Sequence, residues 1–246
     1  METLDSWKQR SELLLGAEGL SRLANARVMV IGIGGVGSSC AEALVRGGVG
    51  HLVFVDGDVV QPSNLNRQAI AFVGTLGRDK VEVMADMAHA INPAADVTAC
   101  KRVVLSDDVE GLLDEHPVDF VVDCQDTVAT KIALAASCER RGIALVSSMG
   151  AGNRFDPTQL AFSDIYETSV CPLCRVVRKR ARAAGIGHLR VLYSREPLPD
   201  LSAARASAVA GEHPPIGTMS YLPPIMGQML AADVICTLAH VPWKRG

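Results

Sequence analysis

The sequence predicts an α/β fold in which helices cover both faces of a mostly parallel central sheet, with a smaller C-terminal extension of helix and strand. Two observations predict this fold class. Between residues 28 and 148, short β-branched runs alternate with helical patterns, which is typical of a parallel sheet. At 32–37 a glycine-rich turn, GIGGVG, joins an apolar run to a helical pattern, as the first unit of such a sheet requires.

The elements of the first 148 residues follow in a regular order. We expect strands near 28–31, 51–55, 96–100, 119–122 and 144–147. We expect helices near 38–47, 79–91, 107–115 and 129–141. Asn92-Pro93 ends the second of these helices, because proline cannot continue one, and the polar residues from Ser106 to Asp108 begin the third.

Three segments are expected along the chain: a helical arm over 1–24, an adenylating domain over 25–164 and a C-terminal extension over 165–246. The extension should contain a basic helix from about 172 to 184 and a strand near 189–193, after a short strand near 159–162. The proline-rich segment 195–217 predicts a mobile loop or lid. The apolar stretch 222–239 is interrupted by prolines and an aspartate, which indicates a buried helix and not a membrane span.

Composition limits the classes of function. The chain has 246 residues, 48% hydrophobic and 4% aromatic, and its net charge of −3 gives no global field that would attract nucleic acid or a membrane. Any polyanion must therefore bind a local patch. The seven cysteines form no compact disulfide framework and no signal segment is visible, so we expect a cytoplasmic protein.

The glycine turn predicts a Rossmann-like nucleotide site. A backbone without Cβ atoms lets a phosphate chain approach closely, and the following helix presents free N–H groups and the positive end of its dipole. Asp56 ends the next apolar run nearly 20 residues further on. This is the spacing at which an acid reaches a ribose in such sites.

The residues after Asp56 favour ATP with Mg²⁺ over NAD. A dinucleotide site would continue into another helix, but here a long polar loop follows and contains Arg67, and Lys80 begins the next predicted helix. Both cations suit a triphosphate, and hydride transfer needs neither. Asp123 and Asp126 come just after another strand, where a magnesium ion bridging phosphates finds carboxylates.

Several motifs together resemble the adenylate-forming superfamily of ubiquitin-activating enzymes and their bacterial relatives (ThiF, MoeB and HesA). They are GIGGVG at 32–37, Asp56 and Asp58, SNLNRQ at 63–68, Lys80, INP at 91–93 and DCQDT at 123–127. A narrower resemblance, to the branch of tRNA threonylcarbamoyladenosine dehydratases, rests on residues 150–152, 156–159, 163–180, 191–196 and 217–235.

The resemblance implies a role for each matching residue. Asp56 would hold the ribose, Arg67 and Lys80 the phosphates, and Asp126 the Mg²⁺. Catalysis would be carried by Arg67, Lys80 and Asp126 together with Arg10. Arg10 resembles an arginine that reaches the ATP site of a partner chain, which implies a homodimer. The residues expected to bind the nucleotide are Gly32, Gly34, Gly35, Gly37, Asp56, Asp58, Asn64, Asn66, Arg67, Gln68 and Lys80.

The implied reaction is an ATP-dependent cyclisation of threonylcarbamoyladenosine in tRNA. The modification's carboxylate attacks the α-phosphate of ATP, and a neighbouring atom then closes a ring and releases AMP. The alternative is an adenylyltransferase acting on the C-terminal glycine of a ubiquitin-like sulfur carrier. Relatives are also linked to sulfur-mobilising proteins, which are further expected partners.

The basic run after residue 174 supplies the missing local patch. We expect Arg175, Arg178, Lys179 and Arg182 to contact the tRNA backbone, with Arg180, Arg190 and Arg195 nearby, although a solvated face would look the same. Tyr166, Tyr193 and Tyr221 could stack on a splayed base, or simply pack.

Cys171 and Cys174 form the only CxxC pair in the chain. Sulfur-carrier activators have two such pairs around a zinc ion, so the missing second pair favours the tRNA reading. Three hypotheses for this pair stay open: the cysteines are incidental residues at the start of a helix, they form part of a zinc site, or they have a redox or thioester function if the pKa of one thiol is lowered.

Overall fold

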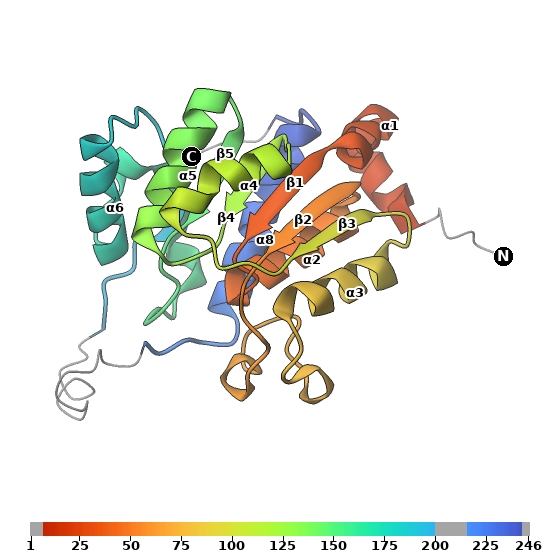
Figure 1. Ribbon diagram of the computed structural model, residues 1–246, viewed down its shortest axis with the longest axis horizontal. Helices are drawn as coiled ribbons and strands as arrows, with labels where there is room; N and C mark the ends of the chain where they lie inside the picture. The colour runs from red at the N-terminus through yellow and green to blue at the C-terminus, as the bar shows by residue number, and fades with distance from the viewer. Residues whose placement is uncertain (1–6, 200–215, 243–246) are drawn as a thin grey trace.

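The computed structural model describes residues 7–199 and 216–242 and confirms the predicted fold class. Seven strands form one sheet in the order β3-β2-β1-β4-β5-β7-β6 (Figure 1). Every neighbouring pair is parallel except β6 and β7, which are antiparallel. The strands are β1 (Arg27–Ile31), β2 (His51–Val55), β3 (Asp96–Cys100), β4 (Phe120–Asp123), β5 (Ala144–Ser148), β6 (Leu160–Asp164) and β7 (Arg190–Ser194).

The described helices agree closely with the sequence patterns. They are α1 (Gln9–Asn25), α2 (Gly35–Gly47), α3 (Lys80–Ile91), α4 (Val109–Glu115), α5 (Val128–Arg141), α6 (Pro172–Ala183) and α8 (Leu222–Leu238). The short 3-10 helices are η2 (Pro62–Asn64), η3 (Val73–Thr75), η4 (Ser106–Asp108), η5 (Pro157–Gln159) and η6 (Ile165–Glu167). Helix α2 begins three residues before the expected position, so the glycine motif itself forms its first turn.

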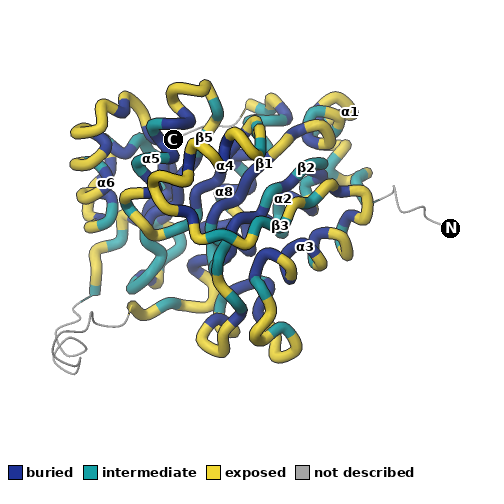
Figure 2. The backbone as a smooth tube through the Cα atoms, viewed as in Figure 1, coloured by how far each residue is buried: buried dark blue, intermediate teal, exposed yellow. Residues whose placement is uncertain are grey.

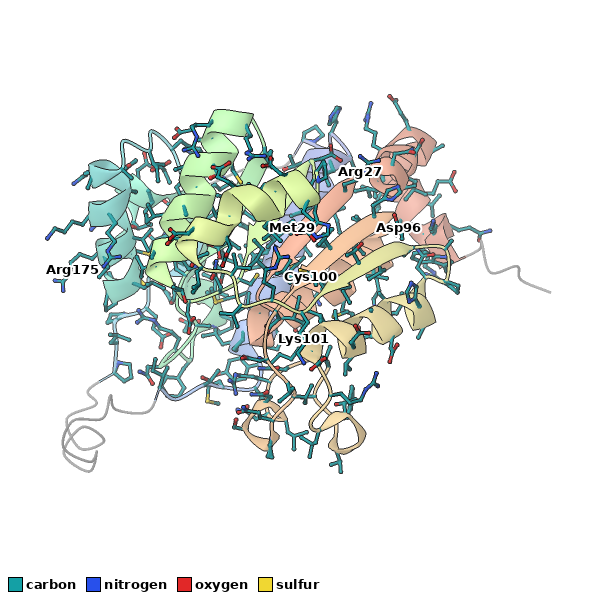
Figure 3. The ribbon with its side chains drawn as sticks, in the orientation of Figure 1. Arg27, Met29, Asp96, Cys100, Lys101 and Arg175 are labelled. Carbon is teal, nitrogen blue, oxygen red and sulfur yellow. The ribbon has the colours of Figure 1, made fainter. Side chains whose placement is uncertain are left out.

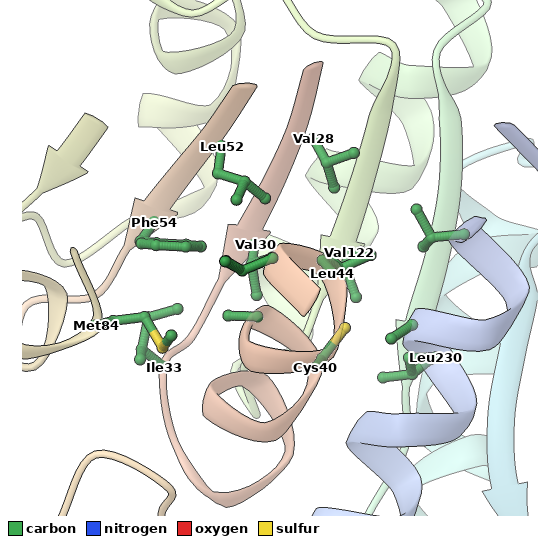
Figure 4. Close-up of a cluster of buried hydrophobic side chains, with 14 of the residues drawn as sticks. Val28, Val30, Ile33, Cys40, Leu44, Leu52, Phe54, Met84, Val122 and Leu230 are labelled. Atoms are coloured by element: carbon green, nitrogen blue, oxygen red, sulfur yellow. The ribbon is translucent and has the colours of Figure 1, made fainter. Parts of the chain in front are cut away.

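The central strands are apolar on both faces because helices cover both. In β1, Val28 and Val30 pack with α2, α3 and α8, whereas Met29 and Ile31 pack with α4 and α5. Figure 4 shows the first of these clusters, and the tube in Figure 2 is dark blue along the inner strands. Burial on both sides explains why the strands are continuous apolar runs without alternation.

The C-terminal helix α8 belongs to the same core as the glycine motif. Gly227 lies so close to α2 that an added Cβ would be 2.3 Å from the carbonyl oxygen of Val36. Strands β6 and β7 also extend the sheet that β1 begins. The predicted division at residue 164 stays a prediction, and sheet and core run across it. Of the predicted mobile segment 195–217, residues 200–215 lie outside the described part.

Candidate active site

The largest group of predicted site residues meets at the carboxyl edge of the sheet. A cavity of about 310 Å³ is lined by residues that directly follow β1, β2, β3 and β4. Successive strands β1, β2 and β3 run toward one side of the sheet, and β4 then lies on the other side of β1. Ligands of open α/β sheets bind at such a switch point.

The glycine turn forms one wall of this cavity. Two of its glycines, Gly32 and Gly34, differ in what would surround an added side chain. Gly32 has φ +90°, and an added Cβ would lie 2.9 Å from the backbone of Cys124 and Gln125. Gly34 lines the cavity, and its nearest neighbour would be 3.9 Å away, at Nε2 of Gln68. Packing therefore explains Gly32, whereas Gly34 leaves room for a ligand beside the N-terminus of α2.

Asp56 is positioned by the backbone around it. Its Oδ2 accepts a hydrogen bond from the backbone N–H of Ile33 at 2.7 Å, and its Oδ1 accepts one from Asp58 at 2.8 Å. The carboxylate lines the cavity with unused lone pairs on both oxygens. This arrangement suits the ribose hydroxyls that the sequence assigned to it.

Lys80 joins Asp56 at the cavity wall. Its Nζ lies 2.7 Å from Oδ2 of Asp58 and 3.8 Å from Oδ1 of Asp56, and only 7% of its side chain is exposed. Asp58 is 67% exposed, so its end of the pair can exchange for a ligand phosphate at little cost in solvation.

The loop with Arg67 lies beside the glycine turn and borders a second cavity. Arg67 packs against Gly35, and its Nη1 donates to the carbonyl oxygen of Ser63 and to Oδ1 of Asn66. Arg67, Asn66 and Gln68 line an adjoining cavity of about 420 Å³, not the one that holds Lys80. Within the described residues, the two predicted phosphate-binding cations thus face neighbouring cavities on either side of the glycine turn.

The polar side chains of this loop divide into two kinds. Asn64 is buried and its Oδ1 accepts from the backbone of Gln61, and Nδ2 of Asn66 donates to the carbonyl oxygen of Thr218. These contacts hold the loop to itself and to the segment before α8. Gln68 is also buried, but its Oε1 has no partner among the described residues.

The segment after β4 brings Gln125 and Asp126 to the opposite wall. Asp126 is exposed and borders the cavity, so its carboxylate is free to ligate a Mg²⁺ ion together with phosphate oxygens. Nε2 of Gln125 is buried without a partner in the described part of the chain. This orphaned amide donor is one that a polar ligand in the cavity would satisfy.

A second buried lysine was not predicted as a site residue from the sequence. Lys131, in the first turn of α5, donates to Oδ2 of Asp123 at 2.9 Å, to Oγ of Ser147 at 3.1 Å and to the carbonyl oxygen of Ser148 at 2.9 Å. Its side chain is completely buried. The available signal was a lysine among the apolar positions of a helix that follows an aspartate at a strand end.

Residues after β3 also line the cavity and were not predicted. Arg102, Val103 and Leu105 form its outer wall, with Arg102 3.0 Å from Glu115. Val103 and Leu105 are exposed apolar side chains, a surface suited to a purine ring. Beneath them, burial and then the charge of Asp123 raise the pKa of the Cys124 thiol, so this cysteine stays protonated.

Helix α6 bears the predicted basic patch, but its arginines differ. Arg175 is exposed and points away from the sheet (Figure 3), as Lys179 and Arg182 do by their exposure. Arg178 is half-buried and donates to the carbonyl and hydroxyl oxygens of Thr168, both at 2.8 Å. Arg182 stacks on Tyr166 at 5.4 Å.

Two residues near the predicted basic patch, Arg190 and Tyr193, do not belong to its exposed surface. Arg190 makes two hydrogen bonds of 2.9 Å with buried Asp233, so its charge is neutralised. Of the two alternatives left open for Tyr193, stacking on a base or packing, the structure shows packing: the residue is only 2% exposed and lies in the cluster under α6. Tyr221 is exposed and donates to the carbonyl oxygen of Phe155.

Arg10 lies on the exposed surface of α1. That helix leads into β1 at the amino edge of the sheet, and Lys8 approaches Gly48, whereas the cavity lies at the carboxyl edge (Figure 1). Leu13 and Leu14 on the same helix are 87% and 84% exposed. Arg10 therefore does not line the cavity of its own chain.

No group of three or more histidine, cysteine or acidic side chains suited to a metal occurs among residues 7–199 and 216–242. Within the same residues, no helix is long and apolar enough to cross a membrane.

A glycine turn, an acid held by backbone N–H groups and a buried lysine at the switch point of a parallel sheet are the features of a nucleotide-binding α/β protein. The chain matches the model of the ThiF family over residues 8–244, and it belongs to that family. This confirms the resemblance drawn from the motifs.

Two relatives and one solved structure show which proteins within this comparison the chain is similar to. The tRNA threonylcarbamoyladenosine dehydratase of Bacillus subtilis is 43% identical over 188 residues, which cover 76% of this chain and 74% of the relative. A crystal structure of the E. coli tRNA N6-threonylcarbamoyladenosine dehydratase in complex with ATP has a TM-score of 0.84 at 31% identity and covers 96% of both chains. The E. coli molybdopterin-synthase adenylyltransferase is 36% identical over 139 residues, 56% of this chain and 54% of its own.

Proposed function

We propose that this protein is an ATP-dependent enzyme that dehydrates threonylcarbamoyladenosine in tRNA to its cyclic form. The observation that carries the proposal is the cavity at the carboxyl edge, where the open side of Gly34, the paired Lys80 and exposed Asp126 surround one space. Relatives with this activity match most of the chain, and the E. coli structures hold ATP or AMP.

The net change to the tRNA in this reaction is the loss of one water. The carboxylate of the modification attacks the α-phosphorus of ATP, and pyrophosphate leaves. A neighbouring atom of the same modification then attacks the activated carbonyl, closes the ring and releases AMP. The protein's part is to neutralise charge and to orient the reactants, so no nucleophile of its own is required.

Each residue has a defined part in this proposal. Asp56 binds the ribose hydroxyls, the helix N-terminus at Gly34 receives phosphate, and Lys80 exchanges Asp58 for a phosphate oxygen. Arg67 binds phosphate from the adjoining cavity after leaving its contact with Asn66. When bound at Asp126, Mg²⁺ would neutralise charge on the phosphates.

The working unit we propose is a homodimer in which Arg10 completes the partner's site. Support comes from the exposure of Leu13 and Leu14 on the same helix and from the position of α1 at the far edge of the sheet. If Arg10→Ala and Asp126→Ala variants are each inactive, mixing them should restore activity, because each mixed dimer has one site with neither change. No recovery after subunit exchange would place Arg10 in its own chain's site or outside catalysis.

The tRNA contact we propose is the exposed face of α6, with Arg175, Lys179 and Arg182 neutralising backbone phosphates and Arg178 held at its edge by Thr168.

The decisive experiment incubates the protein with ATP, Mg²⁺ and tRNA bearing threonylcarbamoyladenosine, and weighs the digested nucleosides. The expected result is the loss of one water from the modified nucleoside, abolished by Asp126→Ala. If no water is lost and ATP–pyrophosphate exchange appears only when a ubiquitin-like sulfur carrier is added, the alternative adenylyltransferase function is correct.

A further inference from the structure

The CxxC pair lies outside the ATP cavity, and the proposed reaction does not use it. Cys171 is the residue before α6, with extended backbone angles, and Pro172 is the first helical residue. Cys174 lies in the first turn of this twelve-residue helix. Both side chains pack in the cluster between α6 and the sheet.

The two thiols have opposite acidities. The pKa of Cys171 is lowered to about 5, mainly by a hydrogen bond from the thiol of Cys174, with the backbone N–H groups of Cys174 and Leu173 and the charge of Arg154 adding to it against the effect of burial. The pKa of Cys174 is raised, because its proton is held in that bond and the group is buried. The sulfur of Cys171 is thus a thiolate nucleophile, and Cys174 stays a protonated thiol.

Cys171 borders a cavity, and 5% of the residue is exposed. This cavity of about 310 Å³ is lined by Val170, Cys171, Pro172, Arg175 and Arg178. The positive charges of Arg175 and Arg178 favour an anionic ligand in this cavity. Arg154, whose charge acts on Cys171, is 2% exposed, and its Nε is buried without a partner in the described part of the chain. Arg154 does not line this cavity, so its charge acts on the Cys171 sulfur from the protein interior.

We propose that Cys171 and Cys174 form a redox-active dithiol that exchanges with small anionic disulfides. The Cys171 thiolate attacks one sulfur of the disulfide and forms a mixed disulfide, and a small thiolate leaves. Cys174 then gives its proton to solvent, attacks the sulfur of Cys171 and releases the second thiolate. The two cysteines are oxidised to a disulfide, and the incoming disulfide is reduced to two thiols.

Digestion isolates this pair, because the tryptic peptide 155–175 contains Cys171 and Cys174 and no other cysteine. The full-length protein is equilibrated with mixtures of reduced and oxidised glutathione, quenched with acid and digested. We expect the peptide to become lighter by two hydrogens as the fraction of oxidised glutathione rises. A peptide that stays in the dithiol form with oxidised glutathione alone would overturn the proposal.

Two variants assign the roles. In Cys174→Ser, whose hydroxyl can still donate to the sulfur, glutathione should remain attached to Cys171. In Cys171→Ser, no adduct should form on Cys174. Adducts in both variants, or in neither, would contradict the assigned order of attack.

The unmodified protein gives a test that depends on no variant. At pH 6, Cys171 should react with iodoacetamide at least about tenfold faster than Cys100, a half-buried cysteine whose pKa is raised. The rate at Cys171 should change little between pH 6 and pH 8, whereas the rate at Cys100 should rise throughout. Equal rates and parallel pH profiles would show that Cys171 is an ordinary thiol. These measurements require neither ATP nor tRNA, so they are independent of the proposed enzyme function.

Discussion

Two buried lysines at the same edge of the sheet have different surroundings. Lys131 is completely enclosed, and its ammonium group is satisfied by Asp123, Ser147 and the carbonyl oxygen of Ser148. Lys80 borders the cavity and holds Asp58, whose side chain is two-thirds exposed. The first pair has no space for a ligand, whereas the second has a partner that a ligand can replace.

This difference in surroundings suggests that Lys131 has a structural role and that Lys80 has a role in binding a ligand. A buried charge that is fully hydrogen-bonded fixes the backbone around it, and here it ties the end of β4 to the start of α5 on either side of Asp126. A buried charge with a solvated partner keeps its capacity to bind something else. We therefore expect changes at Lys131 to act on stability and changes at Lys80 to act on catalysis.

The largest expected effect on folding is that of Lys131→Met. It leaves the Asp123 carboxylate buried without its counter-charge, which should lower the free energy of unfolding by about 3–5 kcal/mol. Denaturant unfolding followed by circular dichroism measures this. The double variant Lys131→Met with Asp123→Leu should recover much of the loss, and a single variant as stable as the parent would contradict the structural role.

Lys80→Met should have its main effect on catalysis. Removing a cation that meets developing phosphate charge should lower kcat/KM for ATP by about 10²–10³-fold. Asp56 keeps its two backbone donors, so the free energy of unfolding should change by no more than about 1 kcal/mol. A stability loss as large as that of Lys131→Met, with activity retained in the folded fraction, would reverse the comparison.

Ser147→Ala tests the enclosed site more gently. The Ser147 hydroxyl donates to Asp123 at 2.6 Å and accepts from Lys131, so its removal should cost about 1–2 kcal/mol of stability. The KM for ATP should stay within about twofold of the parent, since the ion pair itself remains. A rise in this KM at unchanged stability would connect Ser147 to the ATP site directly.

The smallest expected effects are on α6, where the same contrast recurs. Arg182→Met should reduce the salt dependence of tRNA binding by about one unit of slope, and Arg178→Met should reduce it less and should lower stability by about 1 kcal/mol through lost contacts to Thr168. Filter binding at several salt concentrations separates the two. Identical slopes for both variants and the parent would make α6 a solvated face.

Much of the fold was predictable because local patterns and tertiary packing agree. The five strands of 28–148 and the helices between them were predicted to within a few residues, since apolar runs and capping signals mark them in the sequence. The family and the ATP-type site were predicted from spaced motifs, and the structure brings Asp56, Lys80 and Asp126 to one cavity. The start of α2 was misplaced because glycines, poor helix formers, here begin the helix.

The sequence by itself determined the alternation of strands and helices, the residue types of the nucleotide site and the CxxC pair. Only the tertiary structure decided which charges are free. Lys131 and Lys80, or Arg178 and Arg182, look alike along the chain. Their roles differ because folding gives Lys131 and Arg178 hydrogen-bond partners that are less exposed than Asp58, the partner of Lys80, and leaves Arg182 exposed. The same holds for the glycine turn, where only the folded neighbours show that Gly32 is required by packing and that Gly34 leaves room for a ligand.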